Sequence, residues 1–251
     1  MLTRIQIEQF HHDGYLLLRQ RVSLAACAIM RSVVLQQLHE HAAPLEYEAD
    51  VGYAGAPATR DAPGGHTVRR LRAAYRRHPC FQQWAGDPGL IASLVQLFNQ
   101  PVVLNLAHHN CVMTKQPGWG TATGWHQDIR YWCFSDSNLI TVWLALGEEH
   151  AGNGGLQVIP GSHRWKIGPD QLDSLDFLRP ELPQNQALVS QGTALSLAPG
   201  DVLYFHSGLF HSAGKNLSGE RKLSLVFAYH GSATLAQVGS RSAAAGEVSF
   251  T

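Results

Sequence analysis

The stretch Trp125-His126-Gln127-Asp128 places a histidine and an aspartate two positions apart. In an extended strand, residues two apart point to the same side of the chain, so both side chains can reach one metal ion. A His-x-Asp triplet alone is a weak signal, because it occurs by chance and can equally be a surface hydrogen bond. The pair becomes informative only if a third ligand lies elsewhere in the chain.

Two histidines compete for the role of third ligand, because the stretch Tyr204-Phe205-His206-Ser207-Gly208-Leu209-Phe210-His211 contains both. His211 lies 83 residues after Asp128 (211 − 128). Two histidines and one carboxylate form the facial triad of non-heme iron(II) oxygenases, which leaves coordination positions open for a chelating cosubstrate and for dioxygen. The residues alone leave His206 and His211 as nearly equal alternatives.

A basic residue, Arg221, follows His211 by ten positions. In a strand, Arg221 would share one face with a row of large apolar residues at every second position, which are Leu223, Leu225, Phe227 and Tyr229. We therefore predict that Arg221 points into an apolar interior, where an unpaired charge is very costly. A carboxylate bound in bidentate fashion is its natural partner. The alternative is that Arg221 ends its strand in solvent or pairs with Asp or Glu.

Helical patterns dominate the first part of the chain, apart from a short buried strand expected at residues 15–18. The predicted helices cover residues 3–12, 23–41, 67–81 and 88–98. Thr3 and Gln6 match a capping box at the start of the first helix. The segment Pro44–Gly65 is rich in Gly and Pro, which predicts a long loop. A loop of this length in a compact domain is typically functional, so we expect a lid over a substrate entrance.

From Pro101 onward the pattern changes to short β-rich segments separated by Gly-rich turns. These segments are residues 102–106, 139–144, 156–159, 201–205 and 222–229. Helices followed by strands predict an α+β fold with a mainly β core, arranged as a sandwich or barrel. We expect one domain over residues 1–251, with a helical part at about 1–100 and a strand core at about 101–230.

Composition excludes several classes of protein. Lys plus Arg equals Asp plus Glu, 19 against 19, so net charge makes no case for nucleic acid or an anionic membrane. The cluster of Arg69, Arg70, Arg72, Arg76 and Arg77 is interpreted as a solvated helix face. The four cysteines form no C-x-x-C pair, and no stretch has the length of a membrane span or a signal core. We expect a cytoplasmic protein; the sequence does not determine its oligomeric state.

Four stretches together resemble the phytanoyl-CoA dioxygenase (PhyH) family of iron(II)- and 2-oxoglutarate-dependent oxygenases. They are residues 10–15 (FHHDGY), 125–131 (WHQDIRY), 153–163 (NGGLQVIPGSH) and 200–206 (GDVLYFH), the last followed by His211, Asn216 and Arg221. The similarity spans about residues 3 to 230, with the motifs in matching order. The resemblance implies a double-stranded β-helix (cupin-like jelly roll) with the N-terminal helices packed on it.

The same resemblance implies the site. It selects His211 over His206, so that His126, Asp128 and His211 hold iron(II), and it makes Arg221 the anchor of 2-oxoglutarate. The residues that it places along the cosubstrate pocket are Trp143, Asn110 and Cys111, although Trp143 could equally be an ordinary core tryptophan. A cosubstrate contact by Arg70 or Arg72 stays open, because each falls near a basic residue of the family only in a loose alignment. His163 is expected to support a turn and not to bind the metal.

The implied reaction is hydroxylation of an unactivated C–H bond in a small-molecule substrate, a metabolite or lipid-like compound, with dioxygen consumed and succinate and carbon dioxide released. One alternative is a halogenase, against which Asp128 argues, because halogenases of related fold lack this carboxylate. Another is a non-catalytic cupin-like binding protein or a zinc-bound isomerase, against which the triad and Arg221 argue. The primary substrate does not follow from the sequence, because fold and site chemistry are shared across many substrates.

Overall fold

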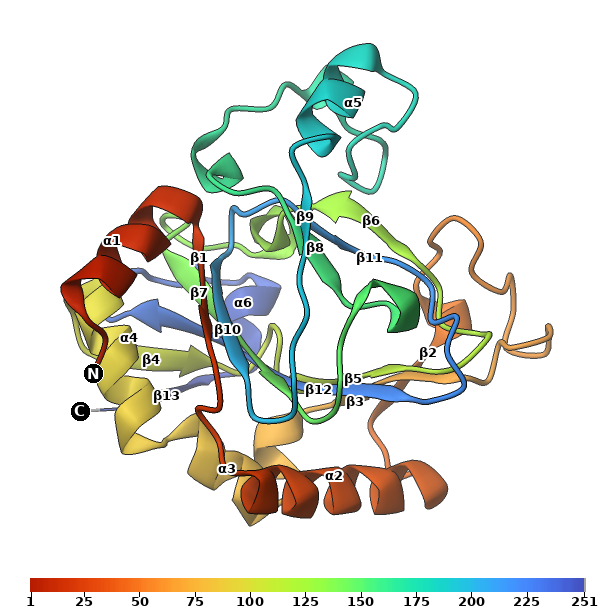
Figure 1. Cartoon of the computed structure of the whole chain (residues 1–251), viewed down its shortest axis with the longest axis horizontal. Helices are drawn as coiled ribbons and strands as arrows, with labels where there is room; N and C mark the ends of the chain where they lie inside the picture. The colour runs from red at the N-terminus through yellow and green to blue at the C-terminus, as the bar shows by residue number, and fades with distance from the viewer. Residues whose placement is uncertain (251) are drawn as a thin grey trace.

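The strand-forming segments pair into two antiparallel sheets that face each other (Figure 1). The computed structural model describes residues 1–250. The larger sheet has the order β1 (Tyr15–Leu18), β10 (Val202–His206), β7 (Leu139–Ala145), β12 (Lys222–Gly231), β5 (Cys111–Lys115), β3 (Val68–Arg72) and β2 (Leu45–Tyr47), with β4 (Val102–Asn105) and β13 (Glu247–Phe250) continuing from β12. The smaller sheet has the order β6 (Thr123–His126), β11 (His211–Ala213), β8 (Leu156–Val158) and β9 (Thr193–Ala194). The predicted double-stranded β-helix is thus confirmed.

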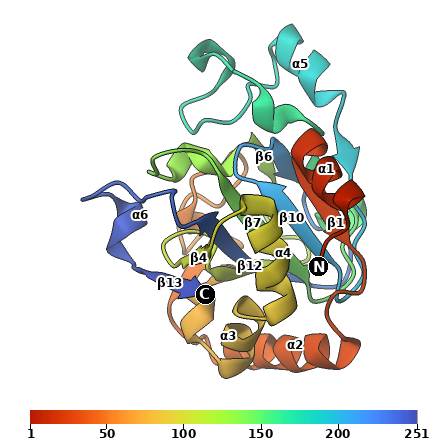
Figure 2. The same cartoon turned by 90° about the vertical axis from the view of Figure 1, so that its left-hand side faces the viewer.

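Helices cover the outer face of the larger sheet. They are α1 (Arg4–Asp13), α2 (Leu24–His39), α3 (Pro79–Ala85) and α4 (Pro88–Phe98), and Figure 2 shows α2, α3 and α4 gathered on that side. Each begins at a capping side chain, and the predicted capping box of Thr3 and Gln6 is present. Two shorter helices, α5 (Pro183–Val189) and α6 (Arg241–Ala244), lie outside this group.

Strand β12 is buried on both faces, and its two faces meet different surroundings. Its large apolar residues, such as Leu223 and Phe227, belong to the core between the larger sheet and the helices, with Trp84 and Leu94. On the opposite face, Val226 belongs to the interior between the two sheets. Since side chains alternate along a strand, Lys222 shares the inward face with Val226, and it lines the cavity there.

The helix predicted at residues 67–81 is mostly wrong. Residues 68–72 form β3, which pairs with β2 and β5, and only the last part of the segment joins α3. Arg69 is buried and is therefore not on a solvated helix face. Pairing with β5, which is distant in sequence, overrides a local pattern that also suits a helix. The helical N-terminal part also contains β1, β2 and β3, all of which complete the larger sheet.

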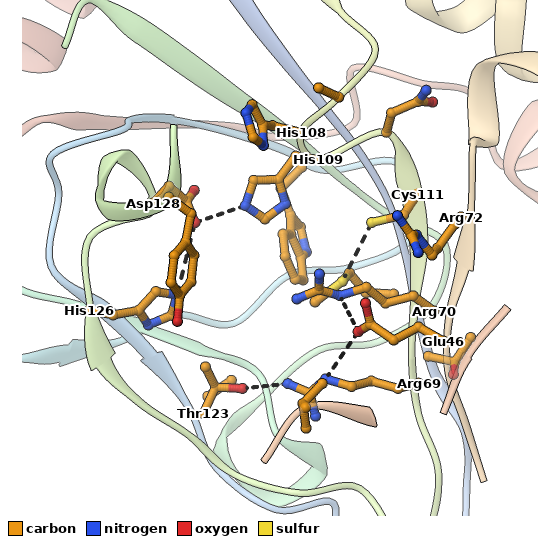
Figure 3. Close-up of a pocket in the computed structure, with 18 of the residues that line it drawn as sticks. Glu46, Arg69, Arg70, Arg72, His108, His109, Cys111, Thr123, His126 and Asp128 are labelled. Atoms are coloured by element: carbon orange, nitrogen blue, oxygen red, sulfur yellow. Dashed lines mark hydrogen bonds and ion pairs between the residues drawn. The ribbon is translucent and has the colours of Figure 1, made fainter. Parts of the chain in front are cut away.

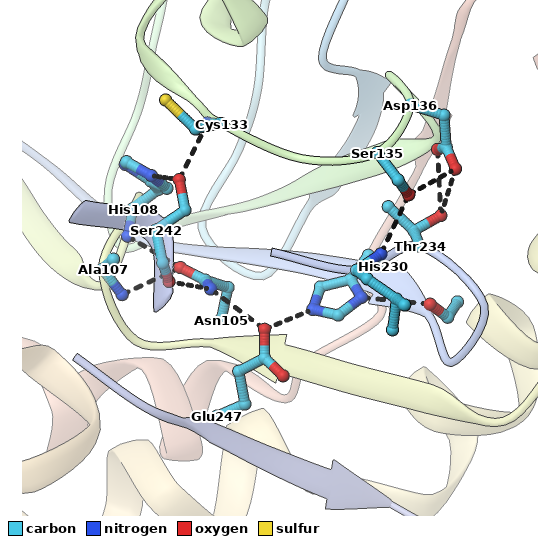
Figure 4. A network of polar contacts seen from close by, with 12 residues as sticks. Asn105, Ala107, His108, Cys133, Ser135, Asp136, His230, Thr234, Ser242 and Glu247 are labelled. Atoms are coloured by element: carbon cyan, nitrogen blue, oxygen red, sulfur yellow. Dashed lines mark hydrogen bonds and ion pairs between the residues drawn. The ribbon is translucent and has the colours of Figure 1, made fainter. Parts of the chain in front are cut away.

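The last segment of the chain returns to the sheet as α6 and β13 and is held by a polar network (Figure 4). Ser242 Oγ lies 2.7 Å from His108 Nε2 and accepts a hydrogen bond from the Cys133 backbone at 2.8 Å. Asn105 Nδ2 donates to the Ser242 carbonyl at 3.1 Å. Glu247 Oε1 lies 3.1 Å from His230 Nε2. The network fastens α6 beside the loop between β4 and β5.

Asp201, at the start of β10, fastens the chain around β1. Its carboxylate accepts hydrogen bonds from the Gln20 backbone at 2.8 Å, from the Ala198 backbone at 2.9 Å and from Arg19 Nη1 at 2.7 Å. Although burial would raise the pKa of Asp201, these hydrogen bonds outweigh it and lower the pKa. The Asp201 side chain is only 1% exposed, so its removal leaves the backbone donors of Gln20 and Ala198 without the acceptor that they share.

We expect Asp201→Ala to lower the free energy of unfolding by about 1.5–3 kcal/mol, the typical contribution of hydrogen bonds to a charged group. Urea denaturation followed by circular dichroism measures the change. The matched control is Asp61→Ala, because Asp61 is exposed. Equal stability of the two variants would show that the carboxylate of Asp201 does not hold β1 and β10 together.

Candidate functional site

A cavity of about 650 Å³ lies between the two sheets. His126, Asp128 and His211 line it together with residues of β3, β5 and β7. Such a volume is within the range of small-molecule sites. The cavity also contains most of the residues that the sequence analysis singled out.

The three predicted metal ligands come together in this cavity. One ligand atom from each of His126, Asp128 and His211 lies within 4.8 Å of the other two, and these three form a metal-binding group among the described residues. Nε2 of His126 is 3.9 Å from Asp128 Oδ1, and Nε2 of His211 is 3.7 Å from the same oxygen. The sheet supplies this proximity, because His126 on β6 is the direct cross-strand partner of His211 on β11.

Backbone carbonyls orient both histidine rings. His126 Nδ1 lies 2.8 Å from the Gly124 carbonyl, and His211 Nδ1 lies 3.0 Å from the Leu209 carbonyl. A carbonyl can only accept, so each Nδ1 carries the proton and each Nε2 presents a lone pair. Burial lowers the pKa of both rings, which favours the neutral form that a metal requires. The donor set therefore fits a divalent iron ion.

Asp128 is fixed from both oxygens. Oδ1 lies 2.8 Å from His109 Nε2, and Oδ2 accepts a hydrogen bond from Thr141 Oγ1 at 3.0 Å. Burial by itself would raise the pKa of the Asp128 carboxyl, but the positive charge of His109 and the hydrogen bond from its ring hold the pKa well below its usual range. Asp128 is therefore a carboxylate at neutral pH, ready to bind a cation.

His109 is a site residue that the sequence analysis missed. It follows β4 in a loop, and its φ of 40° lies in the left-handed region that non-glycine residues rarely adopt. Figure 3 shows its ring between Asp128 and the arginines of β3. Strained backbone conformations are common at functional sites, but a φ angle is not readable from sequence, so only the fold reveals this residue.

His206, the competing histidine, lies outside the metal group. It is on β10, and its ring faces His163, with the centroids 5.3 Å apart. Burial lowers the pKa of His206 to about 4, so it is neutral at physiological pH. His163 also packs against Gly14, where an added Cβ would lie 2.3 Å from His163 Nδ1. Both histidines thus belong to the packing between α1 and β10.

Arg221 does not reach the cavity in the structure. Its Nε donates to Gln116 Oε1 at 2.6 Å, and it lies in a separate surface hollow with Leu38, His41 and Trp119. The expected inward orientation fails because the apolar row that begins at Leu223 faces the helices. Arg221 and that row do share one face of the strand, but it is the face opposite the metal.

Two lysines occupy the place where Arg221 was expected. Lys222 is the cross-strand partner of Lys115, and both are buried and line the cavity. Lys222 Nζ lies 3.1 Å from Glu149 Oε2, and the same carboxylate accepts a hydrogen bond from Trp143 Nε1 at 3.1 Å. Burial and the charges of Lys222 and Arg69 lower the pKa of Lys115 to about 7. Glu149 pairs with Lys222 but makes no ion pair with Lys115.

The other predicted cosubstrate residues do line the cavity. Trp143, Asn110 and Cys111 are buried and contribute to its wall. Asn110 is already engaged, because its Oδ1 accepts from the Tyr75 backbone at 2.8 Å and its Nδ2 donates to the Leu106 carbonyl at 3.2 Å. The role of these residues in cosubstrate binding stays a prediction.

Both arginines that the sequence left open also line the cavity: Arg70 and Arg72. Arg70 reaches into it from β3 beside Glu46, with Nε 3.3 Å from the Glu46 carboxylate (Figure 3).

The predicted lid segment has more structure than a loop. It begins with β2, which pairs with β3, and its Glu48 is buried in an ion pair with Arg69 at 3.0 Å. Val51 and Tyr53 of the same segment line the cavity, and the ring of Tyr53 packs edge-on against Phe177 at 5.0 Å. The segment thus forms part of the cavity wall; its movement as a lid stays a prediction.

A centre of two histidines and one carboxylate inside a double-stranded β-helix defines the class of non-heme iron oxygenases. The chain belongs to the phytanoyl-CoA dioxygenase (PhyH) family, whose model matches residues 10–223. It is a 2-oxoglutarate-dependent non-heme iron dioxygenase. The family and reaction class that the sequence motifs indicated are confirmed. Across residues 1–250, the structure contains no helix that is both long and apolar enough to cross a membrane.

Two named relatives are distant in sequence, and a solved structure shares the fold. The ectoine dioxygenase of Streptomyces avermitilis is 23% identical over 86% of this chain and 75% of its own length. The peroxisomal phytanoyl-CoA dioxygenase of Homo sapiens is 29% identical over 50% of this chain and 39% of its own length. The structure of EctD from S. alaskensis with 2-oxoglutarate and 5-hydroxyectoine has a TM-score of 0.75 at 21% identity, covering 94% of this chain and 78% of that chain. This last likeness supports the fold.

We expect one iron(II) per chain, bound by the triad. His211→Ala should lose the metal because it removes a ligand, whereas His206→Ala should retain it. Anaerobic reconstitution with iron(II), followed by elemental analysis, measures the stoichiometry, and circular dichroism checks that both variants are folded. Loss of iron from His206→Ala alone would overturn the assignment.

Proposed function

We propose that His126, Asp128 and His211 hold the iron and that the enzyme hydroxylates an unactivated C–H bond of a small molecule bound in the same cavity. The observation that carries this proposal is that one ligand atom from each of these three residues lies within 4.8 Å of the other two, on the wall of a cavity of about 650 Å³. Three ligands from two strands and a short turn leave room for both cosubstrate and substrate.

Bound iron, with 2-oxoglutarate and dioxygen, supplies an oxidant strong enough to insert oxygen into a C–H bond, with succinate and carbon dioxide as coproducts. The protein supplies orientation, electrostatics and exclusion of water. Thr141 and His109 hold the Asp128 carboxylate in place, and the carbonyls of Gly124 and Leu209 hold the histidines. This fixed carboxylate argues against halogenation, because it fills the position that a halide needs.

We further propose that Lys222 and Lys115 hold the distal carboxylate of 2-oxoglutarate, in place of Arg221. Like charges directly opposite each other on neighbouring strands are destabilising, and Glu149 neutralises only one of the two lysines. A second carboxylate supplied by the cosubstrate would complete the charge balance. Trp143 supports this arrangement, since its indole donates to Glu149 and its ring lies 4.9 Å from Lys222 Nζ.

We expect the loss of Lys222 to weaken 2-oxoglutarate binding by about 2–5 kcal/mol, the usual effect of removing one partner from a buried charged pair. Because Lys222→Ala alone would leave Glu149 unpaired, the better variant is Lys222→Met combined with Glu149→Gln. Calorimetric titration of 2-oxoglutarate into manganese-loaded protein measures the affinity. The matched control is Arg221→Ala, which should bind normally. A large loss in Arg221→Ala with none in the double variant would restore Arg221 as the anchor.

We also expect 2-oxoglutarate to bind more weakly as pH rises from about 6 to about 9. The pKa of Lys115 is lowered to about 7 in the ligand-free protein, so Lys115 loses its charge across this range. An anion favours the protonated form, so binding takes up protons above the free pKa, and affinity can fall by up to about tenfold per pH unit there. Calorimetry in buffers of different ionisation enthalpy measures the proton uptake. The same pH slope in Lys115→Met would exclude Lys115 as its source.

A further inference from the structure

Basic side chains are concentrated in the active-site cavity. The chain as a whole is balanced, with 19 basic and 19 acidic residues. The basic residues on the cavity wall are Arg69, Arg70, Arg72, Lys115, Arg130, Lys222 and Arg241. The acidic residues there are only Glu46 and Asp128. One of these two is a metal ligand, so the excess of positive charge is not balanced by the wall itself.

Part of this positive charge is neutralised by the carboxylates of Glu46, Glu48 and Glu149. Arg69 pairs with Glu48 at 3.0 Å, and Arg70 lies 3.3 Å from Glu46. Lys222 pairs with Glu149, and Lys115 belongs to the proposed cosubstrate site. Three arginines remain that form no ion pair within residues 1–250: Arg72, Arg130 and Arg241.

Arg130 is the most specific of the three, because its guanidinium is held on one side while the two nitrogens of the other edge lack a hydrogen-bond partner. Nη1 donates to the Leu175 carbonyl at 2.7 Å. The group lies over two aromatic rings, 4.3 Å from the centroid of Tyr131 and 4.0 Å from that of Phe177. Nε and Nη2, which together form one fork of the guanidinium, are buried and have no hydrogen-bond partner. Such a fork matches the two oxygens of a carboxylate or phosphate.

The residue that carries these unpartnered nitrogens lies close to the metal centre. Arg130 follows the ligand Asp128 in the same short turn. Phe177 packs under Arg130 and also edge-on against the His126 ring, with the centroids 5.5 Å apart. The exposed arginines, Arg72 and Arg241, line the same cavity, and the C-terminal network in Figure 4 fastens α6, which carries Arg241. The rest of this part of the wall includes apolar residues, which are Val51, Leu106 and Trp132.

We propose that the primary substrate is an acid, a small molecule with a largely apolar skeleton whose carboxylate or phosphate group binds the Nε–Nη2 fork of Arg130. The proposal rests on the hydroxylase function given above and names its substrate class. Buried guanidinium nitrogens without a partner are costly, and the anionic group of the substrate removes that cost by accepting hydrogen bonds from Nε and Nη2 of Arg130. The cavity then has two anion sites, with the lysine pair serving the cosubstrate and Arg130 serving the substrate.

The test compares acids with matched neutral amides on manganese-loaded enzyme saturated with 2-oxoglutarate under anaerobic conditions. The probes are benzoate, benzamide and phenyl phosphate, and octanoate, octanamide and octyl phosphate. Calorimetry measures each affinity. In at least one series an anion should bind tenfold or more tighter than the amide, and the tighter of carboxylate and phosphate identifies the anionic group. Arg130→Gln should abolish the preference, and Arg130→Lys should retain only part of it.

The control variant is Arg4→Gln, because the side chain of Arg4 is 91% exposed and distant from the cavity wall. It should keep the wild-type preference for anions. If the wild-type enzyme binds 2-oxoglutarate but treats acids and amides alike, or if folded Arg130→Gln keeps the preference, the proposal is overturned and the hydroxylase function stands. If the wild-type enzyme prefers acids through Arg130 but does not bind 2-oxoglutarate, the anion site stands and the proposed function fails.

Discussion

The pairing of β6 with β11 is the constraint on which the active site depends. It sets His126 directly opposite His211 in the smaller sheet. Side chains alternate between the two faces of a strand, so a slip of one residue would turn His211 away from the cavity. The Leu209 carbonyl, which orients His211, and Phe205, whose ring packs against it at 4.9 Å, come from the same stretch of chain. Register and ring orientation are thus set together.

Charge is the second organising feature of the cavity. Glu46, Glu48 and Glu149 each compensate one basic group of the wall, which lets β3 and β12 carry buried cations into an otherwise apolar interior. A buried ion pair contributes little net stability, because desolvation offsets the attraction between its charges. These ion pairs therefore shape the charge of the cavity more than they stabilise the fold. Charge also acts at the metal centre, where His109 keeps the Asp128 carboxyl ionised by lowering its pKa.

Much of the site follows from the sequence because its signals are local or fixed in spacing. The His126–Asp128 pair follows the spacing of an extended chain, although Asp128 begins a short turn just after β6. The helix at Pro88–Phe98 has clear capping and apolar periodicity, and the remaining motifs define the family. By contrast, no sequence pattern marks His109 as a site residue, and Arg130 is given no role by the motif at residues 125–131 in which it lies. Each becomes part of the site only because a loop or a turn folds against segments distant in the chain, Asp128 in the case of His109 and Leu175 and Phe177 in the case of Arg130.

The sequence alone indicated the reaction class and the fold family, since motif order and spacing are properties of the chain, and the family resemblance predicted His126, Asp128 and His211 as the metal ligands. Only the tertiary structure decided which basic residue enters the cavity. Strand β12 is buried on both faces, so alternation predicts two rows but not which row faces the metal. The large apolar row packs under the helices, and Arg221 points with it, while Lys222 points inward. That choice depends on which sheet face the helices cover, which is a property of the assembled fold.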